Sequence, residues 1–342
     1  MKIYTENELL VAWDDLNFKV TICCVCFNHE KYINSAMEGF FAQRTKFPFK
    51  VLIYDDLSTD KSRDIIKAWQ QKYPHIIETV FPEENQYSKG NRPLDLLLPK
   101  IDTEFISLCE GDDYWCVESK LQKQYDELAT KPQLNICFHP AYTCLDGKIL
   151  DNGYGCQGST SKIIPIKKVI EISGGLMPMA SMFIRTHALI HCRGDFPQFY
   201  RKLLRHSAIQ IISAIKGGAL YLPEKMSVYR SMHEGSWSFQ NAKKLQAQVN
   251  NFIEFTQRNE ELKKITKHNY DRIFDRVMLG RIYRFIGNSN LNLSNRIFSY
   301  RKLLKLPIGS YNKVHGLLAL VLGVLKRILF KVKLLKAKRV NK

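Results

Sequence analysis

Short apolar runs, each followed by an amphipathic stretch, dominate the first third of this chain. Residues 20–25 form a nearly continuous apolar run, which is typical of a strand buried on both faces of a parallel sheet. The apolar residues within 30–43 then recur at helical spacing. Strand-like runs at 49–54 and 76–81 continue the pattern, with a helical stretch between them. This alternation predicts a doubly wound α/β domain, in which ligands bind at the carboxyl edge of the sheet.

Acidic residues gather where two of the strand-like runs end. A fourth run ends in Glu110, Asp112 and Asp113, and the second run ends in Asp55 and Asp56. Carboxylates at a strand end commonly hold a hard cation such as Mg²⁺ or Mn²⁺, which takes oxygen ligands and often substrate phosphates as well. The alternative is an acidic turn that water solvates at the surface. If the strands are parallel, both acidic turns face the same crevice.

The net charge of +18 is spread unevenly along the 342 residues. Residues 1–130 hold 15 Lys and Arg against 22 Asp and Glu, whereas the remainder holds 36 against 11. A basic region can meet nucleic acid, an anionic membrane or a phosphorylated substrate, and charge alone does not choose among them. A nucleic-acid binder needs basic residues interleaved with aromatic side chains, but the aromatic residues here lie mostly within apolar runs. We therefore rank that function well below an enzyme and expect no nucleic-acid partner.

The nine cysteines lie mostly within apolar runs and show no paired metal-ligand spacing. We expect them to be reduced residues, mostly in the core, of a cytosolic protein. The first ten residues contain Thr5-Glu6-Asn7-Glu8 where a signal peptide needs its apolar segment, so we expect no signal peptide there.

Four short motifs between residues 20 and 128 together resemble the family 2 glycosyltransferases of the GT-A fold. They occur in the order and approximate spacing of that family: Phe27-Asn28, Gln43, Asp55-Asp56-x-Ser58-x-Asp60 and Glu110-x-Asp112-Asp113. The similarity continues more loosely to about residue 240, through 178–185 and a closing strand at 221–230 with a Tyr-Arg-x-x-His tail. The resemblance implies an α/β, Rossmann-like domain at 1–240 with a mixed, mostly parallel sheet flanked by helices. Its nucleotide-binding half would span about 18–130 and its acceptor half about 131–240.

The same resemblance implies an inverting transfer of a sugar from a nucleotide-diphosphate sugar to a hydroxyl of a glycan or lipid-linked acceptor, and a UDP-sugar is the expected donor. Such transfers serve the assembly of bacterial surface polysaccharide or glycolipid. A divalent cation, Mn²⁺ or Mg²⁺, would be held by Asp113, with Asp112, Glu110 and His233 as further ligands. The residues implied in nucleotide binding are Val25, Phe27, Asn28, Asp56, Ser58 and Asp112. Lys89, in the loop after the run at 76–81, is a further candidate for contact with the diphosphate, and the alternative is that it faces water. Phe27 would either stack on the base or plug the core at the strand end.

An inverting transfer also needs a general base, and here the chain departs from the family pattern. The position that is an Asp in the family falls on His206. The unperturbed pKa of a histidine, about 6.5, lies near working pH, so a His206 base predicts that kcat/KM falls below about pH 6 to 7. Asp195, in a Gly-Asp-Phe-Pro turn, is the other candidate, unless it only caps the next helix. A nucleotide-sugar-binding protein with weak or no transfer is the remaining alternative.

The end of the chain is basic and partly apolar. Residues 241–300 show helical periodicity and predict a helical extension, whereas 301–342 contain basic residues and no acid. The apolar run at 316–325 is too short for a spanning helix, which needs about 20 residues. It predicts an interfacial helix that binds an anionic leaflet, and therefore a cytoplasmic protein peripheral on the inner face of the cell membrane. A disordered basic tail is the alternative.

Overall fold

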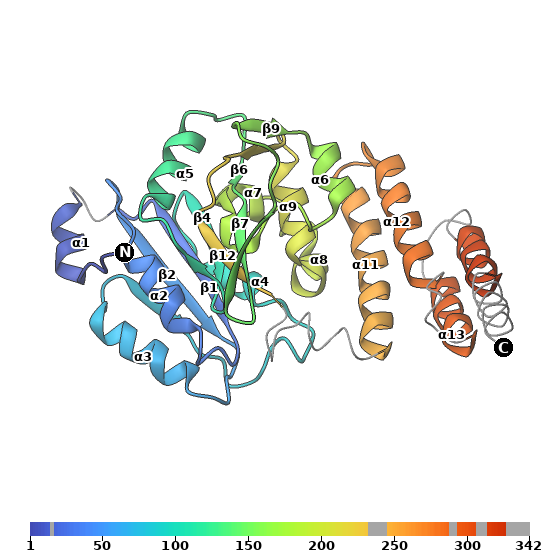
Figure 1. The fold of residues 1–342 in the computed structure, drawn as a ribbon, viewed down its shortest axis with the longest axis horizontal. Coiled ribbons are helices and arrows are strands. Elements are labelled where there is room, and N and C mark those ends of the chain that lie inside the picture. Colours follow the sequence, from blue (N-terminus) through green and yellow to red (C-terminus); the bar gives the residue numbers. More distant parts are fainter. Residues whose placement is uncertain (14–16, 232–244, 287–292, 306–312, 326–342) are drawn as a thin grey trace, which may run out of the picture. The chain divides into compact units, whose positions relative to one another are not determined.

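The structure is a computed structural model that describes residues 1–13, 17–231, 245–286, 293–305 and 313–325. The chain divides into two compact units, at 1–240 and 241–342. The predicted α/β class is confirmed for the first unit, and the predicted helices are present in the second (Figure 1).

An eight-stranded mixed sheet forms the centre of the first unit, in the order β3-β2-β1-β4-β10-β6-β11-β9. Strands β3, β2, β1 and β4 run parallel to one another, and β11 runs parallel to β6. Strand β10 is antiparallel to both of its neighbours, and β9 is antiparallel to β11. The strands are β1 (Val20–Cys26), β2 (Phe49–Asp55), β3 (Ile77–Val80), β4 (Phe105–Glu110), β6 (Ile136–Phe138), β9 (Lys162–Ile164), β10 (Phe183–Arg185) and β11 (Ala219–Tyr221). The four parallel strands contain the apolar runs that predicted them.

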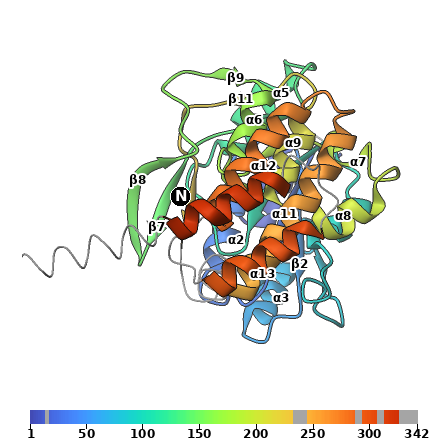
Figure 2. The same ribbon diagram turned by 90° about the vertical axis from the view of Figure 1, so that its right-hand side faces the viewer.

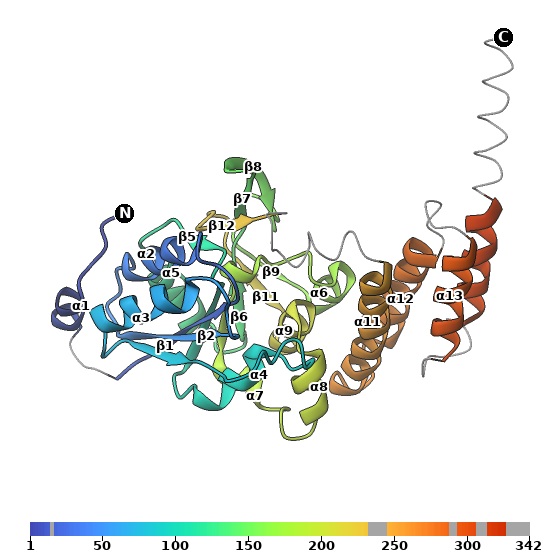
Figure 3. The same ribbon diagram turned by 90° about the horizontal axis from the view of Figure 1, so that it is seen from below.

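A second, four-stranded sheet has the order β5-β12-β7-β8. Its strands are β5 (Tyr114–Trp115), β7 (Ala141–Leu145), β8 (Lys148–Tyr154) and β12 (Ser227–Arg230). Strands β7 and β8 form a hairpin that extends from the rest of this unit (Figures 2 and 3). The closing strand predicted at 221–230 is wrong as a single element, because its residues divide between β11 in the large sheet and β12 in the small one. Pro223, which lacks the amide proton that a ladder needs, lies in the crossing between them.

Helices cover both faces of the large sheet (Figures 1 and 3). They are α1 (Glu6–Ala12), α2 (Ile33–Phe41), α3 (Ser62–Lys72), α4 (Pro93–Leu97), α5 (Lys120–Ala129), α6 (Ile166–Ile172), α7 (Thr186–Ile190), α8 (Pro197–Leu203) and α9 (His206–Ala214), with 3₁₀ turns at Leu98–Lys100 and Met179–Ser181. The α2 helix begins directly after the turn that ends β1, as the periodicity of 30–43 predicted.

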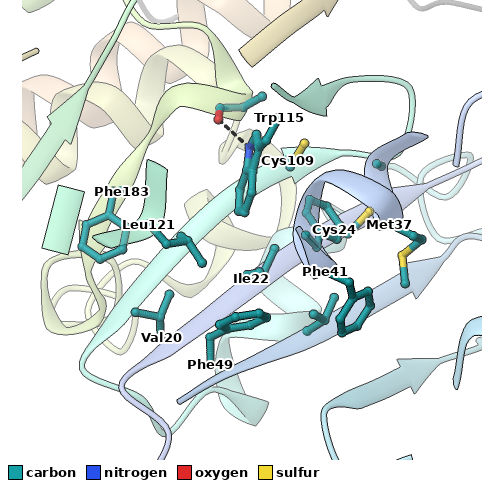
Figure 4. Packing of buried hydrophobic residues seen from close by; sticks show 14 of the residues in the cluster. Val20, Ile22, Cys24, Met37, Phe41, Phe49, Cys109, Trp115, Leu121 and Phe183 are labelled. Carbon is teal, nitrogen blue, oxygen red and sulfur yellow. Dashed lines mark hydrogen bonds between the residues drawn. The ribbon is translucent and has the colours of Figure 1, made fainter. Parts of the chain in front are cut away.

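Trp115 connects the core to the end of β4. Its side chain is fully buried, and its indole Nε1 donates to the backbone oxygen of Ala180 at 2.9 Å (Figure 4). Gly39 on α2 allows this packing, because a Cβ atom there would lie 2.9 Å from the backbone oxygen of Trp115. The Phe40 ring meets the indole edge to face at 4.8 Å. Asp113, two residues earlier, is therefore fixed by the core rather than by a free loop.

All nine cysteines are free thiols, as predicted, and most of them are buried. The group at 23, 24 and 26 lies within β1, where burial raises the pKa of each thiol. These cysteines behave as small core residues.

The second unit consists of helices packed around its own apolar cluster. They are α11 (Leu245–Ile265), α12 (Asp271–Ile286), α13 (Leu293–Leu304) and a further helical segment at 313–325. The cluster contains Phe252, Phe255, Met278, Ile282, Ile286, Leu303 and Ala319. Among the described helices, none combines the length and the apolar character that crossing a membrane requires.

A buried lysine lies beneath the acidic strand end. Lys120 Nζ donates to Gln124 Oε1 at 2.7 Å and to Ser107 Oγ at 3.2 Å, and it lies 3.9 Å from the centroid of the Trp115 ring. Burial lowers the pKa of Lys120 to about 7. The two polar contacts and the indole face stabilise the amine, and none of the described carboxylates pairs with it.

Replacement of this amine should change how stability depends on pH. The pKa of Lys120 is about 7 in the folded state, whereas an unfolded lysine has a pKa of about 10.4. Between these values the unfolded state binds more protons, so the unfolding free energy of the wild type should rise relative to that of Lys120→Met. From pH 7 to pH 9 the gain should be about 2 to 3 kcal/mol, measured by urea denaturation. Exposed Lys123→Met is the matched control and should show no such trend; equal slopes in both variants would contradict the assignment.

Candidate functional site

The turns after β1, β2 and β4 meet at one edge of the large sheet. In the parallel register, Val25 of β1 lies opposite Glu110 of β4, and Cys26 lies opposite Asp55 of β2. The Gly111 amide donates to the Val25 oxygen at 2.9 Å. The two acidic turns therefore share the crevice edge that the sequence predicted.

Asn28 and Ser58 connect two of these turns. The Asn28 amide donates to Ser58 Oγ at 2.9 Å, and the Thr59 amide donates to Asn28 Oδ1 at 2.8 Å. Asn28 adopts the left-handed conformation (φ 57°), which an asparagine tolerates better than most residues. The neighbouring Phe27 side chain is 43% exposed, so its interpretation as a core plug is wrong. Its ring remains available for stacking.

Asp56 organises the loop after β3. Its buried carboxylate accepts the Tyr54 hydroxyl at 3.0 Å and the Gln86 amide at 2.8 Å on Oδ1, and the Tyr87 amide at 2.9 Å on Oδ2. A carboxylate has about four acceptor positions, so one position at Oδ2 remains for a ligand. Lys89, on the same loop, forms an ion pair with Glu84 at the surface. In this structure Lys89 therefore pairs with a residue of its own loop.

Asp113 is the most deeply buried of the three acidic residues after β4, at 1% exposure. Its Oδ1 accepts the backbone amide of Arg230 on β12 at 2.8 Å, while Oδ2 is buried with no partner among the described residues. Burial, then the charges of Asp112 and Glu110, raise the pKa of Asp113 well above its usual range. Burial and the Asp112 charge also raise the pKa of Glu110, to about 8. The site carries more negative charge than its surroundings neutralise.

The three acidic side chains do not converge on one point. Asp113 faces β12, whereas Asp112 Oδ2 lies 3.8 Å from His29 Nε2, so the described part of the chain contains no ready three-ligand metal cluster. A divalent cation nevertheless fits the donor set, because Asp113 Oδ2 is a buried oxygen without a partner among the described residues, and the charges of Asp112 and Glu110 raise the pKa of Asp113. His233, the fourth predicted ligand, lies outside the described residues.

His206 begins α9 and holds a loop on the acceptor side. Its Nε2 lies 2.6 Å from the Met177 oxygen, which also accepts from Gln210 Nε2 at 2.9 Å. Because the carbonyl only accepts, Nε2 carries the proton and the lone pair lies on Nδ1. Burial lowers the pKa of His206 to about 4. With this pKa, a His206 base predicts that activity falls at a lower pH than 6 to 7, since burial disfavours the charged ring.

Asp195 lies exposed in the turn before α8. The N-cap of α8 is Phe196 and has no side-chain cap, so the structure does not support the capping interpretation of Asp195. Arg193 in the same turn pairs with Asp95 at 2.7 Å, which places the turn beside α4. A cavity of about 330 Å³ there includes Arg193 and Gly194 but none of the predicted site residues.

Sequence reasoning missed how distant segments hold the site together. Arg230 contacts Asp113 across 117 positions, and Gln124 of α5 donates to the Ser181 oxygen at 2.8 Å. Gln210 was also missed, although its spacing of one helical turn from His206 could have suggested contact. For Arg230 the only signal was its place in the Tyr-Arg tail, because no periodicity relates it to Asp113.

Comparison with known proteins finds a family match in the first half of the chain. Residues 21–159 match the model described as Glycosyl transferase family 2. An uncharacterized protein of Mycobacterium tuberculosis is 31% identical over 222 residues, which cover 64% of this chain and 60% of that protein.

Two solved structures resemble this chain in fold. A crystal structure of Staphylococcus aureus TarS 1–349 in complex with UDP has a TM-score of 0.53 at 14% identity and covers 89% of both chains. The mannosyltransferase PcManGT from Pyrobaculum calidifontis, in complex with GDP-Man and Mn²⁺, has a TM-score of 0.51 at 12% identity and covers 92% of this chain and 90% of its own. At these identities the likeness concerns the fold alone, and it agrees with the predicted GT-A architecture.

Proposed function

We propose that this chain transfers a sugar from a nucleotide-diphosphate sugar to an acceptor hydroxyl, with inversion at the anomeric carbon. The observation that carries the proposal is the unused, buried oxygen of Asp113 at the sheet edge shared with exposed Phe27 and the partly free Asp56 carboxylate. The family match over residues 21–159 and the UDP, GDP-Man and Mn²⁺ in the similar structures support it. A UDP-sugar is the proposed donor.

Different residues at this sheet edge would contact different parts of the nucleotide. Phe27 stacks on the base, and Asp56 Oδ2 accepts a base N–H. The backbone at Val25 forms the pocket wall, while Asn28 and Ser58 keep the two turns at a fixed distance. Lys89 would have to leave Glu84 before it could contact the nucleotide.

A divalent cation held by Asp113, with Asp112 beside it, supplies positive charge against the diphosphate that leaves. Glu110, at the strand end, would add negative charge once a bound cation displaces its proton. In the transfer itself, the acceptor oxygen forms a bond to the anomeric carbon as the bond to the diphosphate breaks. The diphosphate keeps the electron pair, and the acceptor proton passes to the base.

His206 is the proposed base, acting through Nδ1. Its lowered pKa of about 4 is close to that of an aspartic acid, the residue that the family pattern places at this position. The imidazole is therefore neutral, with a free lone pair, throughout the neutral pH range. Exposed Asp195 is the second candidate.

Binding without transfer is the alternative function. The hydrogen bond of His206 to the Met177 oxygen favours it, since this contact alone gives the histidine a structural role on the acceptor-side loop. Both functions predict donor binding, but only the transferase predicts turnover.

The helix at 313–325 is proposed to attach the protein to an anionic membrane. Val314, Leu317, Leu318, Val321, Leu322 and Leu325 are exposed, each by 45% or more. Gly316 lies against Leu303, where a Cβ atom would approach a Leu303 methyl group to 2.3 Å, so the opposite face packs on α13. Basic residues flank the helix in the sequence. This attachment would bring the site to a lipid-linked acceptor in surface polysaccharide or glycolipid assembly.

Donor binding should depend on Asp113 through the cation. Asp113→Asn keeps the hydrogen bond from Arg230 and removes the charge, so UDP with Mn²⁺ should no longer raise the melting temperature. For the wild type, a ligand at 100 times its Kd adds about 2.7 kcal/mol to the unfolding free energy. Exposed Asp64→Asn is the control and should respond as the wild type does. Equal stabilisation of wild type and Asp113→Asn would show that the cation is held elsewhere.

Turnover should distinguish the two base candidates. His206→Ala should lose about 10² to 10⁴-fold in kcat/KM with donor affinity unchanged, whereas Asp195→Asn should be mild. His206→Asp should recover part of the loss. The wild-type kcat/KM should show no decline attributable to His206 between pH 8 and 6, because its pKa of about 4 lies below this range. Near-normal turnover of His206→Ala would exclude it as the base.

Membrane attachment should depend on the exposed leucines. Leu318→Gln with Leu322→Gln should reduce flotation with vesicles containing phosphatidylserine, because these side chains are half-exposed and contribute little to the core. Nucleotide binding should be unchanged. High salt should weaken the wild-type attachment, and neutral vesicles should bind less. Unchanged flotation of the double variant would refute the interfacial helix.

A further inference from the structure

One face of the small sheet is buried at its base and exposed toward the tip of the β7–β8 hairpin. At the base, Ser227 of β12 pairs with both Trp115 and Ala141, and all three residues are fully buried. Side chains of paired residues point to the same face, and every second residue along a strand shares that face. The face therefore continues along alternate residues of β7 and β8 toward the hairpin turn (Figure 3).

Leu145 and Leu150 lie on this face, near the hairpin turn. Leu150 pairs with Thr143, and Leu145 lies two residues further along β7. Leu145 is 38% exposed and Leu150 is 40% exposed. Ile149 is 50% exposed but lies on the opposite face, because it pairs with Cys144. The face that is buried at its base thus ends in an exposed aliphatic surface.

Tyr154 lies where the face leaves the core. It pairs with buried Ala141, but is itself only partly buried. Its ring centroid lies 5.2 Å from that of Tyr229, and the strand partner of Tyr229, Thr143, also pairs with Leu150. The two tyrosine rings therefore connect the buried base of the face to its leucines.

The Tyr154 phenol lies near the acidic turn after β4. Burial, then Tyr229 and the charges of Asp113 and Glu110, raise the pKa of Tyr154, so these carboxylates act on the phenol. The backbone contact is direct as well, because the amide of Arg230, the residue after Tyr229, donates to Asp113 Oδ1 at 2.8 Å. The two tyrosines thus lie beside the proposed donor site.

Gly155 places Tyr154 against the acceptor-side loop. Its φ of 80° favours glycine, and a Cβ atom there would lie 2.6 Å from Pro178 Cδ and 2.9 Å from the Leu176 oxygen. The backbone beside Tyr154 therefore packs on the segment that also accepts the hydrogen bond of His206. An acceptor placed between the acidic turn and His206 would contact Tyr154.

We propose that this face binds the acceptor as an amphiphile, with a sugar ring on Tyr154 and a hydrocarbon chain along Leu150 and Leu145. The inference rests on the proposed function and selects a lipid-linked sugar among the acceptors that it allows. An aromatic face covers the C–H face of a sugar ring while the hydroxyl groups stay at the edge. Exposed leucines bind a hydrocarbon chain, whereas a longer glycan would need polar partners in their place.

Octyl glycosides below their micellar concentration test this face in the full-length protein, with the methyl glycosides of the same sugars as controls. Glucose, galactose, mannose and N-acetylglucosamine serve as the sugars, because stacking on a ring face does not select one of them. At least one octyl glycoside should bind in calorimetry, and its methyl counterpart should bind more weakly, by about 10-fold or more.

Variants of the face separate its aromatic part from its aliphatic part. Leu145→Gln with Leu150→Gln should weaken octyl glycoside binding about 10-fold and leave UDP binding unchanged. Tyr154→Ser should weaken octyl glycoside binding about 3- to 10-fold, whereas Tyr154→Phe, which keeps the ring, should bind as the wild type does. Ile149→Gln, which removes a similarly exposed side chain from the opposite face of the same hairpin, is the matched control and should also bind normally.

Equal octyl glycoside affinities of the wild type and the leucine double variant would refute the inference, as would binding of none of the octyl glycosides. In either case the proposed function stands if UDP still binds with Mn²⁺ present. An equal loss in Ile149→Gln and in the double variant would show nonspecific binding to the hairpin and would also refute it. If octyl glycosides bind but none of UDP, GDP, CDP and dTDP does, the proposed function fails, and the face is not an acceptor site.

Two other occupants of the leucines are distinguished with the same double variant. Release from phosphatidylserine vesicles, with glycoside binding unchanged, would assign the leucines to a membrane. Conversion of a dimer to a monomer in sedimentation, again with glycoside binding unchanged, would assign them to a second copy of this chain. Either result would overturn the acceptor assignment.

Discussion

The buried carboxylate of Asp113 is the constraint on which the rest of the site depends. It lies at the end of a central strand, close to two other acids, and its only described hydrogen bond comes from the backbone of Arg230. Burial of an ionised carboxylate without compensation costs several kcal/mol, so the folded protein favours the neutral form and the pKa rises. A cation or a proton must therefore accompany Asp113. The metal proposal follows from this need for positive charge.

The core explains why the fold tolerates such a site. Trp115 anchors the segment after Asp113 by packing against α2 and donating to the Ala180 oxygen. Gln124 holds the neighbouring Ser181 oxygen, and His206 holds the Met177 oxygen from the other side. The segment at 177–181 is thus fixed both to the acidic turn and to α9. The segment at 177–181 therefore connects the donor edge to His206 through hydrogen bonds.

His206 stands where the family resemblance predicts an aspartic acid, and its surroundings give it a similar pKa. In water a histidine is a stronger base than an aspartate, but burial lowers the pKa of this ring into the carboxylate range. The Met177 carbonyl also selects one tautomer, which leaves the lone pair on Nδ1. The environment therefore gives the imidazole two properties of the residue it replaces. This similarity makes the catalytic and the purely structural interpretations both physically coherent.

The local sequence pattern was sufficient to predict the first strands and helices and the sheet edge at which the acidic turns meet. The apolar runs predicted β1, β2, β3 and β4, and the periodicity predicted the helices between them, because burial in a parallel sheet requires these patterns. Parallel strands place their carboxyl ends together, so the meeting of the Asp56 and Asp113 turns was also predictable. The division of 221–230 between two sheets was not predictable, because the apolar pattern of a segment does not specify which sheet it joins.

The sequence by itself determined which residue types stand at the ends of the strands, and therefore that this edge is acidic and aromatic. Only the tertiary structure decided which of those groups already have a hydrogen-bond or ion-pair partner. Asn28 and Ser58 bond each other, Lys89 pairs with Glu84, and Asp113 keeps one oxygen without a partner. It also brought Arg230 to Asp113 and lowered the pKa of His206. The reason is physical: hydrogen-bond partners, burial and the pKa values that follow from them depend on contacts between residues far apart in the chain, which local spacing does not encode.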